Sequence, residues 1–279
     1  NRRHASAAFI WATMRRLGAA RRRGLRRERF GYVTGGYARV LDRFASFLEE
    51  AGVSLLLGSR VRRVTGLDGR LTVEREDGET DHFDRVVVTA APPLARRLCP
   101  DLSPQELGNL SAIRYQGVLC ASLLLDRPLA GYYLTNVLDM TIPFAGVIEM
   151  TSMVDPSNFG GQSLVYLLRY VTREDPYHEL SDGEIEARFV GGLRRIHPEV
   201  TPDRIRAFRL SRVRHVFAVP TIGYSRHMPP ARTSVDGLFL VNSAQIPYAT
   251  LNVNETVQLA ESAIGLLLES TTPTTASRG

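Results

Sequence analysis

The chain has 279 residues, of which 44% are hydrophobic and 23% charged, a balance that is ordinary for a globular protein of one large domain or two closely linked ones. No run of about 18 uncharged apolar residues occurs, which excludes a predicted transmembrane helix. The net charge of +6 is a local property, because residues 1–29 hold ten arginines and one glutamate and the rest of the chain is mildly acidic. A nucleic-acid-binding protein would spread its cations over a folded face, so nucleic acid is not expected as a partner.

Cysteine and histidine form no metal-binding pattern. The two cysteines, Cys99 and Cys120, are far apart in the sequence, and two unpaired thiols indicate a reducing, cytoplasmic location. The six histidines are scattered, so the sequence predicts no metal site. The chain also holds no lysine, for which genomic base composition is the simplest explanation.

The first segment, residues 1–29, is predicted to be a basic helical region. Apolar residues recur at helical spacing over 5–18, and a run of arginines follows. We expect a helix packed on its own protein, with peripheral membrane contact through the basic helix as the alternative. The segment lacks the apolar centre of a secretory signal. The first residue is Asn1 rather than Met, which indicates a fragment, a processed chain or a trimmed one.

Residues 30–100 are expected to form one portion of an α/β domain. Gly35 and Gly36 suit the tight turn that opens a helix, and the helix is predicted to run to about Glu50 because its apolar residues follow a three-four spacing. The run VSLLL at 53–57 then predicts a buried strand.

More strands are predicted before residue 100. Asp68-Gly69 indicates a hairpin between strands at 61–67 and 70–75. Three successive valines within 83–89 predict a strand covered on both faces. Pro92-Pro93 forbids further ladder pairing beyond it.

Residues 101–235 are predicted to form a substrate domain. Ser181, followed three residues later by Glu184, predicts a capping box at the start of a helix. Residues 204–217 resemble a strand. Turns rich in Pro, Gly, Asp and Asn separate four earlier strand-like stretches, which predict a mostly antiparallel sheet. These stretches lie at 115–126, 131–138, 144–150 and 163–170.

Residues 236–269 return to an α/β pattern. A short buried strand at 237–241 leads through a polar loop to a helix predicted from about Asn252. The free N–H groups and the dipole at a helix start can hold a pyrophosphate or a flavin carbonyl, although every α/β protein has such turns. Residues 270–279 are expected to be a disordered tail.

Three segments together resemble a known family. The stretch SVDGLFLVNSAQIPYATLNVNETVQLAESAI resembles the closing FAD motif of the flavin amine oxidase and phytoene desaturase superfamily. The stretches YVTGGYARVLDRFASFLEEAGVSLLLGSRVRRV and DRVVVTAAPPLARRL resemble two earlier segments of the same family, in the family's order. Within it, YYLTNVLDMTIPFAGVIEMTSM and GGQSLVYLLRYV look closest to bacterial protoporphyrinogen-oxidase-like proteins.

The resemblance covers residues 5–268 and implies a fold class and a cofactor. The class is α/β with an α+β mixture, a partial FAD-binding Rossmann-like domain that carries an inserted, mostly antiparallel substrate domain. Residues 30–100 and 236–269 would be the FAD-binding portions, and 101–235 the substrate domain. The implied protein is an FAD-dependent oxidoreductase that takes hydride from an apolar organic small molecule.

The same resemblance implies cofactor contacts. Val61 would contact the adenine through its backbone, and Thr89 and Ala90 would lie along the cofactor near its dinucleotide end. Val241-Asn242-Ser243 stands where the family has Ala-Gly-Asp, so that Asn242 takes the place of its acid. The helix start would point at the isoalloxazine ring. The implied contact residues are Val61, Thr89, Ala90, Asn242, Val253 and Asn254.

Two features of this sequence depart from the family pattern. No GxGxxG fingerprint occurs, so the N-terminal dinucleotide-binding portion and its phosphate cradle are expected to be missing from this chain. Many flavin amine oxidases place a lysine near the flavin, and the absence of lysine weakens amine oxidation relative to dehydrogenation of an apolar substrate.

Candidate substrate residues come from the polar groups of the predicted strands and loops. Glu149 lies in an apolar stretch where a carboxylate needs a partner, and Arg169 is the expected one, with a purely structural ion pair as the alternative. The full candidate set is Tyr133, Asn136, Glu149, Tyr166, Arg169, Tyr170 and Tyr224.

Two other functions stay open at this point. A non-redox flavoprotein resembling UDP-galactopyranose mutase would need arginines for a nucleotide diphosphate, for which Arg169, Arg212 and Arg226 are available. A non-catalytic remnant or interaction module is the third possibility.

Overall fold

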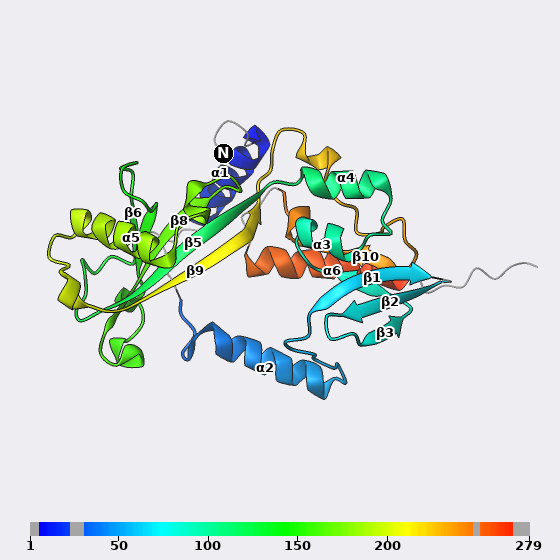
Figure 1. The fold of residues 1–279 in the computed structure, drawn as a ribbon, viewed down its shortest axis with the longest axis horizontal. Helices are drawn as coiled ribbons and strands as arrows, with labels where there is room; N and C mark the ends of the chain where they lie inside the picture. The colour runs from blue at the N-terminus through cyan, green and yellow to red at the C-terminus, as the bar shows by residue number, and fades with distance from the viewer. Residues whose placement is uncertain (1–5, 23–30, 68, 248–251, 270–279) are drawn as a thin grey trace, which may run out of the picture. The chain divides into compact units, whose positions relative to one another are not determined.

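The computed structural model describes residues 6–22, 31–67, 69–247 and 252–269 (Figure 1). The chain divides into two compact units. The first unit comprises Asn1–Glu28, Tyr37–Arg114 and Phe217–Gly279, and the second comprises Arg29–Gly36 and Tyr115–Val216, whereas the sequence placed the substrate domain at 101–235. Helices and sheets occur in both, so the expected mixed fold class is confirmed. None of the helices in the described ranges is long and apolar enough to cross a membrane.

The first unit contains a three-stranded antiparallel meander. Its strands are β1 (Val61–Leu67), β2 (Arg70–Arg75) and β3 (Thr80–Phe83). Gly69 has a φ of 76°, the left-handed conformation that a two-residue hairpin turn requires. Because β1 pairs antiparallel with β2, the predicted hairpin is confirmed, although Asp68 itself lies outside the described residues.

A short parallel pair of strands stands beside this meander in the same unit. β4 (Val86–Val88) pairs in parallel with β10 (Leu238–Leu240), with Val86 opposite Leu238. The strand predicted at 83–89 is therefore shorter than expected. Val87 is 40% exposed, so the prediction of cover on both faces is wrong for this strand. Parallel sheets are normally covered on both faces, and the described residues leave the Val87 face open.

Two helices complete the core of the first unit. They are α3 (Pro92–Leu98) and α4 (Pro104–Ala112). Ser103 and Glu106 form a capping box at the start of α4, and Glu106 also accepts a hydrogen bond from the N–H of Ser234 at 2.8 Å. This contact fixes α4 to the segment that leads into β10. The buried side chains of this core are Val64, Leu71, Val88, Ala95, Cys99, Leu102, Leu110, Leu238 and Leu240.

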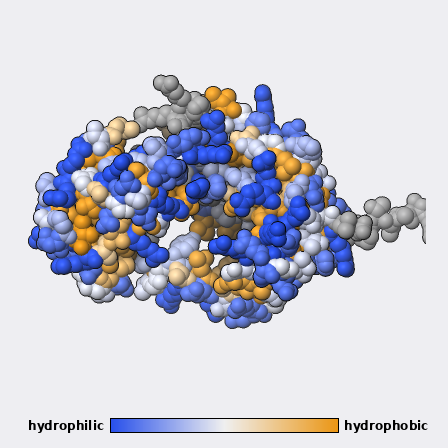
Figure 2. Space-filling view, in the orientation of Figure 1, coloured by the Kyte–Doolittle hydropathy of each residue, from blue (hydrophilic) through white to orange (hydrophobic). Residues whose placement is uncertain are grey.

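Helix α2 (Gly36–Glu50) forms where the sequence predicts it, but none of its residues is buried. Phe44 is 57% and Phe47 59% exposed. The buried strand predicted at 53–57 is wrong, since these residues form irregular coil and a turn, with Leu57 90% exposed. An apolar run becomes a buried strand only when another surface covers it, and the described residues supply none here. Figure 2 shows exposed apolar residues among polar ones on the face in view.

The remaining helices of the first unit are α1 (Ala7–Arg22) and α6 (Val253–Glu269). Phe9 of α1 packs on Phe217, with ring centroids 5.7 Å apart, which agrees with a helix packed on its own protein. The opposite side of α1 is open, and Trp11 is 61% exposed. Two short 3-10 turns, η5 (Tyr224–Arg226) and η6 (Ser243–Gln245), also belong to this unit.

The second unit is built on a five-stranded sheet in the order β6-β7-β8-β5-β9. Pairs β5–β8, β6–β7 and β7–β8 are antiparallel, so the predicted antiparallel sheet is confirmed. The strands are β5 (Tyr115–Leu125), β6 (Leu134–Asn136), β7 (Gly146–Glu149), β8 (Ser163–Val171) and β9 (Ile205–Ala218).

One helix covers one face of this sheet. Helix α5 (Asp182–Ile196) begins at the capping box of Ser181 and Glu184 that the sequence predicts. It buries Ile185, Phe189 and Leu193 in the core of the unit. Short 3-10 turns lie at η1 (Met150–Ser152), η2 (Pro156–Phe159), η3 (Pro176–His178) and η4 (Pro202–Arg204).

Candidate functional site

The carboxyl ends of β4 and β10 meet at one edge of the parallel pair. Val88 is opposite Leu240, and the N–H of Val241 donates to the carbonyl of Val88 at 3.1 Å. Thr89 and Asn242 therefore follow at the same edge. Ligands of open α/β sheets bind beyond the carboxyl ends of the strands, so this edge is the candidate cofactor site of the first unit.

The turn after β10, residues 242–245, is fixed by its own polar groups. The Oδ1 of Asn242 accepts from the N–H of Ala244 at 3.0 Å, and the N–H of Asn242 donates to the Oε1 of Gln245 at 2.9 Å. The side-chain amide of Gln245 donates to the carbonyls of Pro229 at 3.0 Å and Leu240 at 3.1 Å. This capping box holds the turn in one conformation.

One atom of this turn lacks a partner. Asn242 is only 4% exposed, and its Nδ2 has no hydrogen-bond partner within the part of the chain that the structure describes. Leaving a buried donor unsatisfied costs about 1–3 kcal/mol, and folded proteins keep few such groups. An acceptor atom of a molecule bound at this edge would satisfy the donor.

Tyr224 supports the same turn. It is 6% exposed, and its hydroxyl donates to the carbonyl of Ala244 at 2.7 Å. The sequence placed Tyr224 among the substrate candidates of 101–235, whereas the structure places it in the first unit, with its hydroxyl committed to the closing turn. No sequence motif indicates this contact, which joins residues far apart in the chain.

The start of α6 is open to solvent. Asn252 accepts from the N–H of Glu255 at 3.1 Å, as an N-cap residue does. Val253 is 56% exposed, and Asn254 is also exposed. Residues 248–251 lie outside the described residues. At the other end of α6, Arg85 donates to the carbonyl of Leu267, which places a cation where the helix dipole favours it.

The other predicted cofactor residues lie on the surface of the first unit. Val61 opens β1 and is 37% exposed. Thr89 is exposed and Ala90 is half-buried, both just beyond β4. Their contacts with a cofactor stay predictions.

Two of the substrate candidates lie on the sheet face opposite α5. Tyr166 is opposite both Ser122 and Ile148, and Asn136 is opposite Gly146. Tyr166 is half-buried, and burial, followed by the nearby Cys120 and Tyr32, raises its pKa above the usual range. A third candidate, Tyr170, lies four residues further along β8 on the same face and is 55% exposed. This face, which we call the open sheet face, combines aromatic and aliphatic side chains.

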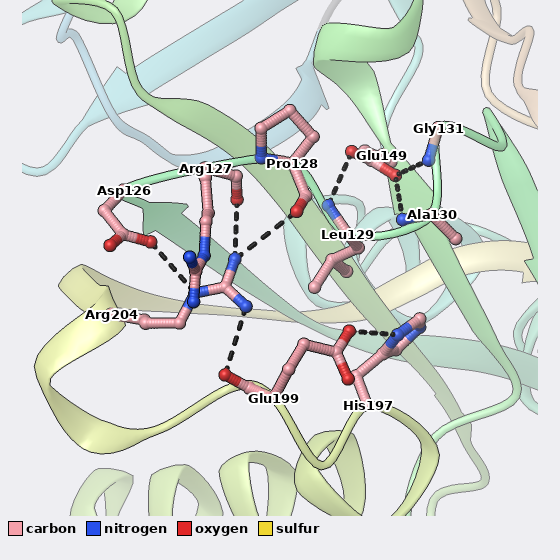
Figure 3. A network of polar contacts seen from close by, with 10 residues as sticks. All are labelled: Asp126, Arg127, Pro128, Leu129, Ala130, Gly131, Glu149, His197, Glu199 and Arg204. Carbon is pink, nitrogen blue, oxygen red and sulfur yellow. Dashed lines mark hydrogen bonds and ion pairs between the residues drawn. The ribbon is translucent and has the colours of Figure 1, made fainter.

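Glu149 has a different role from the one expected. It is 2% exposed, and its carboxylate accepts from the N–H groups of Leu129 at 2.9 Å, Ala130 at 3.2 Å and Gly131 at 2.9 Å (Figure 3). Its own N–H donates to the carbonyl of Tyr133 at 3.0 Å. All these contacts hold the loop between β5 and β6.

Arg169 is not the partner of Glu149, so the predicted ion pair is wrong. Arg169 pairs with Asp175 at 3.1 Å, donates to the carbonyl of Pro143 at 3.1 Å, and stacks over the ring of Tyr177 at 3.9 Å. The register explains the difference: Glu149 is opposite Val165, and four residues of strand separate Val165 from Arg169, about 13 Å at the usual rise.

Sequence reasoning missed Arg204. Its side chain is 2% exposed, and its Nε pairs with Asp126 at 2.9 Å. Its other nitrogens donate to the carbonyls of Glu199 at 3.1 Å and Arg127 at 3.0 Å. In Figure 3 this guanidinium and the Glu149 carboxylate hold successive parts of the loop 126–131. Arg204 stabilises the unit rather than forming a reaction site.

The two cysteines are free thiols. Burial, with a further contribution from Asp101, raises the pKa of Cys99 to about 11, so this thiol is unreactive at neutral pH. Across the described residues, no group of three or more His, Cys, Asp or Glu side chains could hold a metal ion.

Several solved structures share this fold. A candidate protoporphyrinogen oxidase from Exiguobacterium sp. 255-15 matches with a TM-score of 0.64 and 15% identity, over 82% of this chain and 51% of that one. Putrescine oxidase bound to putrescine matches with a TM-score of 0.63 and 19% identity, over 84% and 53%. Reduced UDP-galactopyranose mutase matches with a TM-score of 0.57 and 11% identity, over 80% and 51%.

These matches show the fold, and the chain spans about half the length of each matched structure. No curated protein sequence gives a significant match. A sequence profile described as flavin containing amine oxidoreductase matches residues 3–248, which is most of the chain. The resemblance seen in the sequence is thereby confirmed, and the chain belongs to the flavin containing amine oxidoreductase family.

Proposed function

We propose that this chain is the C-terminal, cofactor-completing part of an FAD-dependent oxidoreductase that transfers hydride from an apolar organic small molecule to the flavin. The observation that carries the proposal is the rigid turn at the carboxyl ends of β4 and β10, with the unpartnered, buried amide of Asn242. The family membership makes a flavin the expected ligand of such an edge.

The residues at this edge fit a flavin dinucleotide. Asn242 supplies a hydrogen-bond donor that the protein itself does not use. Thr89 and Ala90 leave room beyond β4, because Thr89 is exposed. Val253 and Asn254 begin α6, whose free N–H groups favour partial negative charge. The flavin supplies the hydride-accepting group when it is bound.

The open sheet face of the second unit supports an apolar substrate. Val118, Leu164 and Leu168 share the side of the sheet that carries Tyr166 and Tyr170, by the alternation along β5 and β8. Such a face orients a substrate and excludes water, which is most of what hydride transfer requires of a protein. Glu149 and Arg169 are engaged on the other face, so we do not propose them as substrate contacts.

We place the phosphate cradle on a dinucleotide-binding portion outside these 279 residues. Phe44 and Phe47, three residues apart on α2, are 57% and 59% exposed, and Val87 of β4 is 40% exposed. An exposed apolar helix face of this kind usually marks an interface. This chain covers only about half of each matched structure, so the other half of those structures can include such a portion.

An absorption spectrum tests the proposal. The protein is expressed together with the coding sequence upstream of Asn1, purified and supplied with FAD. Flavin absorption bands are expected, and anaerobic addition of an oxidisable apolar substrate should bleach them. A colourless protein that takes up no FAD would overturn the proposal.

A non-redox, mutase-like function has less support. It needs arginines free to bind a nucleotide diphosphate, but Arg169 is paired with Asp175 and Arg212 with Asp182 at 2.6 Å. Of the three candidate arginines, only Arg226 has no ion pair among the described residues. Flavin bands that do not bleach with any oxidisable substrate would favour this function instead.

Peripheral membrane contact by α1 is a separate proposal. Ile10, Trp11 and Met14 are 50%, 61% and 67% exposed, and Arg15 lies over the Trp11 ring at 5.2 Å. Because the 279 residues contain one tryptophan, vesicles of anionic lipid should shift the fluorescence of this chain to the blue if α1 binds them. An unchanged spectrum contradicts the proposal.

A further inference from the structure

We propose that Asn242 recognises FAD as a neutral hydrogen-bond donor, through its Nδ2, to an acceptor oxygen of the cofactor. This inference rests on the proposed function, because it requires FAD at the β4–β10 edge. The motif that this segment resembles carries an acid at the corresponding place, and an ionised acid can only accept. Asn242 would thus reverse the direction of the hydrogen bond.

The direction follows from how the side chain is used. The Oδ1 of Asn242 already accepts from the N–H of Ala244 at 3.0 Å. Flipping the amide would turn its NH2 group against that N–H and break the bond, so the orientation of the amide is fixed. The atom left over is Nδ2, which is buried and has no partner in the described ranges. Nδ2 can donate but cannot accept.

The donor is also held in place before any ligand binds. The backbone N–H and carbonyl of Asn242 are both bonded to Gln245, at 2.9 Å and 3.0 Å. The carbonyl of Ala244 is held by the Tyr224 hydroxyl at 2.7 Å. A donor whose position is already fixed adds to affinity without a further ordering cost.

Three kinds of oxygen in FAD could accept this bond: the phosphoryl oxygens, the ribityl hydroxyls and the isoalloxazine carbonyls. All are acceptors for the same N–H donor. Riboflavin lacks the phosphoryl groups of FMN and FAD but shares the ribityl chain and the isoalloxazine ring, so binding of the three compounds separates a phosphoryl acceptor from an acceptor on the riboflavin part.

The test uses the full-length protein and the variant Asn242→Asp. Aspartate has the same shape and can still accept from Ala244, but it replaces the donor with an acceptor and adds a charge. At pH 8 we expect the Kd for FAD, measured by flavin fluorescence, to rise on the order of ten- to a hundred-fold. Asn158→Asp, at an exposed asparagine of the second unit, should leave the Kd unchanged.

Lowering the pH gives a second signature. A protonated carboxyl has an O–H and donates again, so FAD affinity of Asn242→Asp should recover as the pH falls through the pKa of the new carboxyl. The wild-type affinity should not follow this curve, because an amide does not titrate. A merely structural role of Asn242 predicts no such recovery of binding.

The outcomes separate this inference from the proposed function. A wild-type protein that binds no FAD overturns both. If the wild-type protein binds FAD and the Asn242→Asp variant binds it equally well at pH 8 and at the lower pH, only this inference is overturned. An affinity loss that disappears for riboflavin supports a phosphoryl acceptor, and a loss equal for all three compounds supports an acceptor on the riboflavin part, a ribityl hydroxyl or an isoalloxazine carbonyl.

If Asn242→Asp does not fold, the crystal structure of wild-type protein with FAD decides. An FAD oxygen within about 3.2 Å of Nδ2 supports the inference. A water molecule or a protein carbonyl in that position overturns it.

Discussion

Replacing Glu149 with glutamine weakens the contacts that hold residues 129–131 of the loop between β5 and β6. One carboxylate oxygen accepts from Leu129 and the other from Ala130 and Gly131, at 2.9, 3.2 and 2.9 Å. Glutamine keeps one oxygen, so at least one of these N–H groups then faces an NH2 group. Each hydrogen bond to a charged group contributes about 1.5–3 kcal/mol, and we expect Glu149→Gln to lower the free energy of unfolding by about 2–4 kcal/mol.

Thermal unfolding and hydrogen exchange measure this effect. At about 2–4 °C per kcal/mol for a chain of this size, Tm should fall by roughly 4–16 °C, and the amides of residues 129–131 should lose protection first. Glu174→Gln removes the same charge from an exposed side chain and should change Tm little. An unchanged Tm for Glu149→Gln, together with a higher KM for the substrate, would refute the structural role and restore Glu149 as a substrate contact.

Three further predictions concern stability. Arg204→Met removes the buried guanidinium that binds Asp126 and the carbonyls of Glu199 and Arg127, and it should cost about 2–4 kcal/mol in urea unfolding. The exposed Arg206→Met should cost under about 0.5 kcal/mol. The Gly237→Ala variant should have a lower Tm than the Gly52→Ala variant. Both glycines have positive φ, but only a Cβ at Gly237 would meet a backbone oxygen, at 2.5 Å. Equal Tm values of the two variants contradict this. The pKa of Cys99 is raised from 9.0 to about 11 in the folded state. The contribution of this thiol to stability should therefore be fully present below pH 9 and be lost between pH 9 and 11. Cys99→Ala should remove that part of the pH dependence, and a fall of equal size in the variant contradicts the assignment.

Local chemistry explains which elements could be predicted. The hairpin at Gly69 and the capping box at Ser181 depend on residues within a few positions of each other, so their sequence patterns determine them. The run 53–57 and the strand at Val87 depend on surfaces that must cover them. The sequence pattern alone could not reveal that the described residues leave both exposed.

The candidate site divides in the same way. Asn242 was found because a short motif surrounds it, and its capping contacts are local. The contacts of Tyr224 with Ala244 and of Arg204 with Asp126 span 20 and 78 residues, and no spacing in the sequence indicates them. The expected pairing of Glu149 with Arg169 failed because the register between β7 and β8 decides which side chains meet.

The exposed apolar surfaces and the unsatisfied amide independently indicate that the described residues lack binding partners. Phe44 and Phe47 lack a hydrophobic cover among the described residues, and the Nδ2 of Asn242 lacks an acceptor there. A protein portion can cover the first, and a ligand oxygen can satisfy the second. If a dinucleotide-binding portion covered α2 in the absence of FAD, the Nδ2 of Asn242 would still be unsatisfied. Hydrogen exchange in α2 should therefore slow when that portion is present, with or without FAD. The effect of Asn242→Asp should appear only when FAD is present.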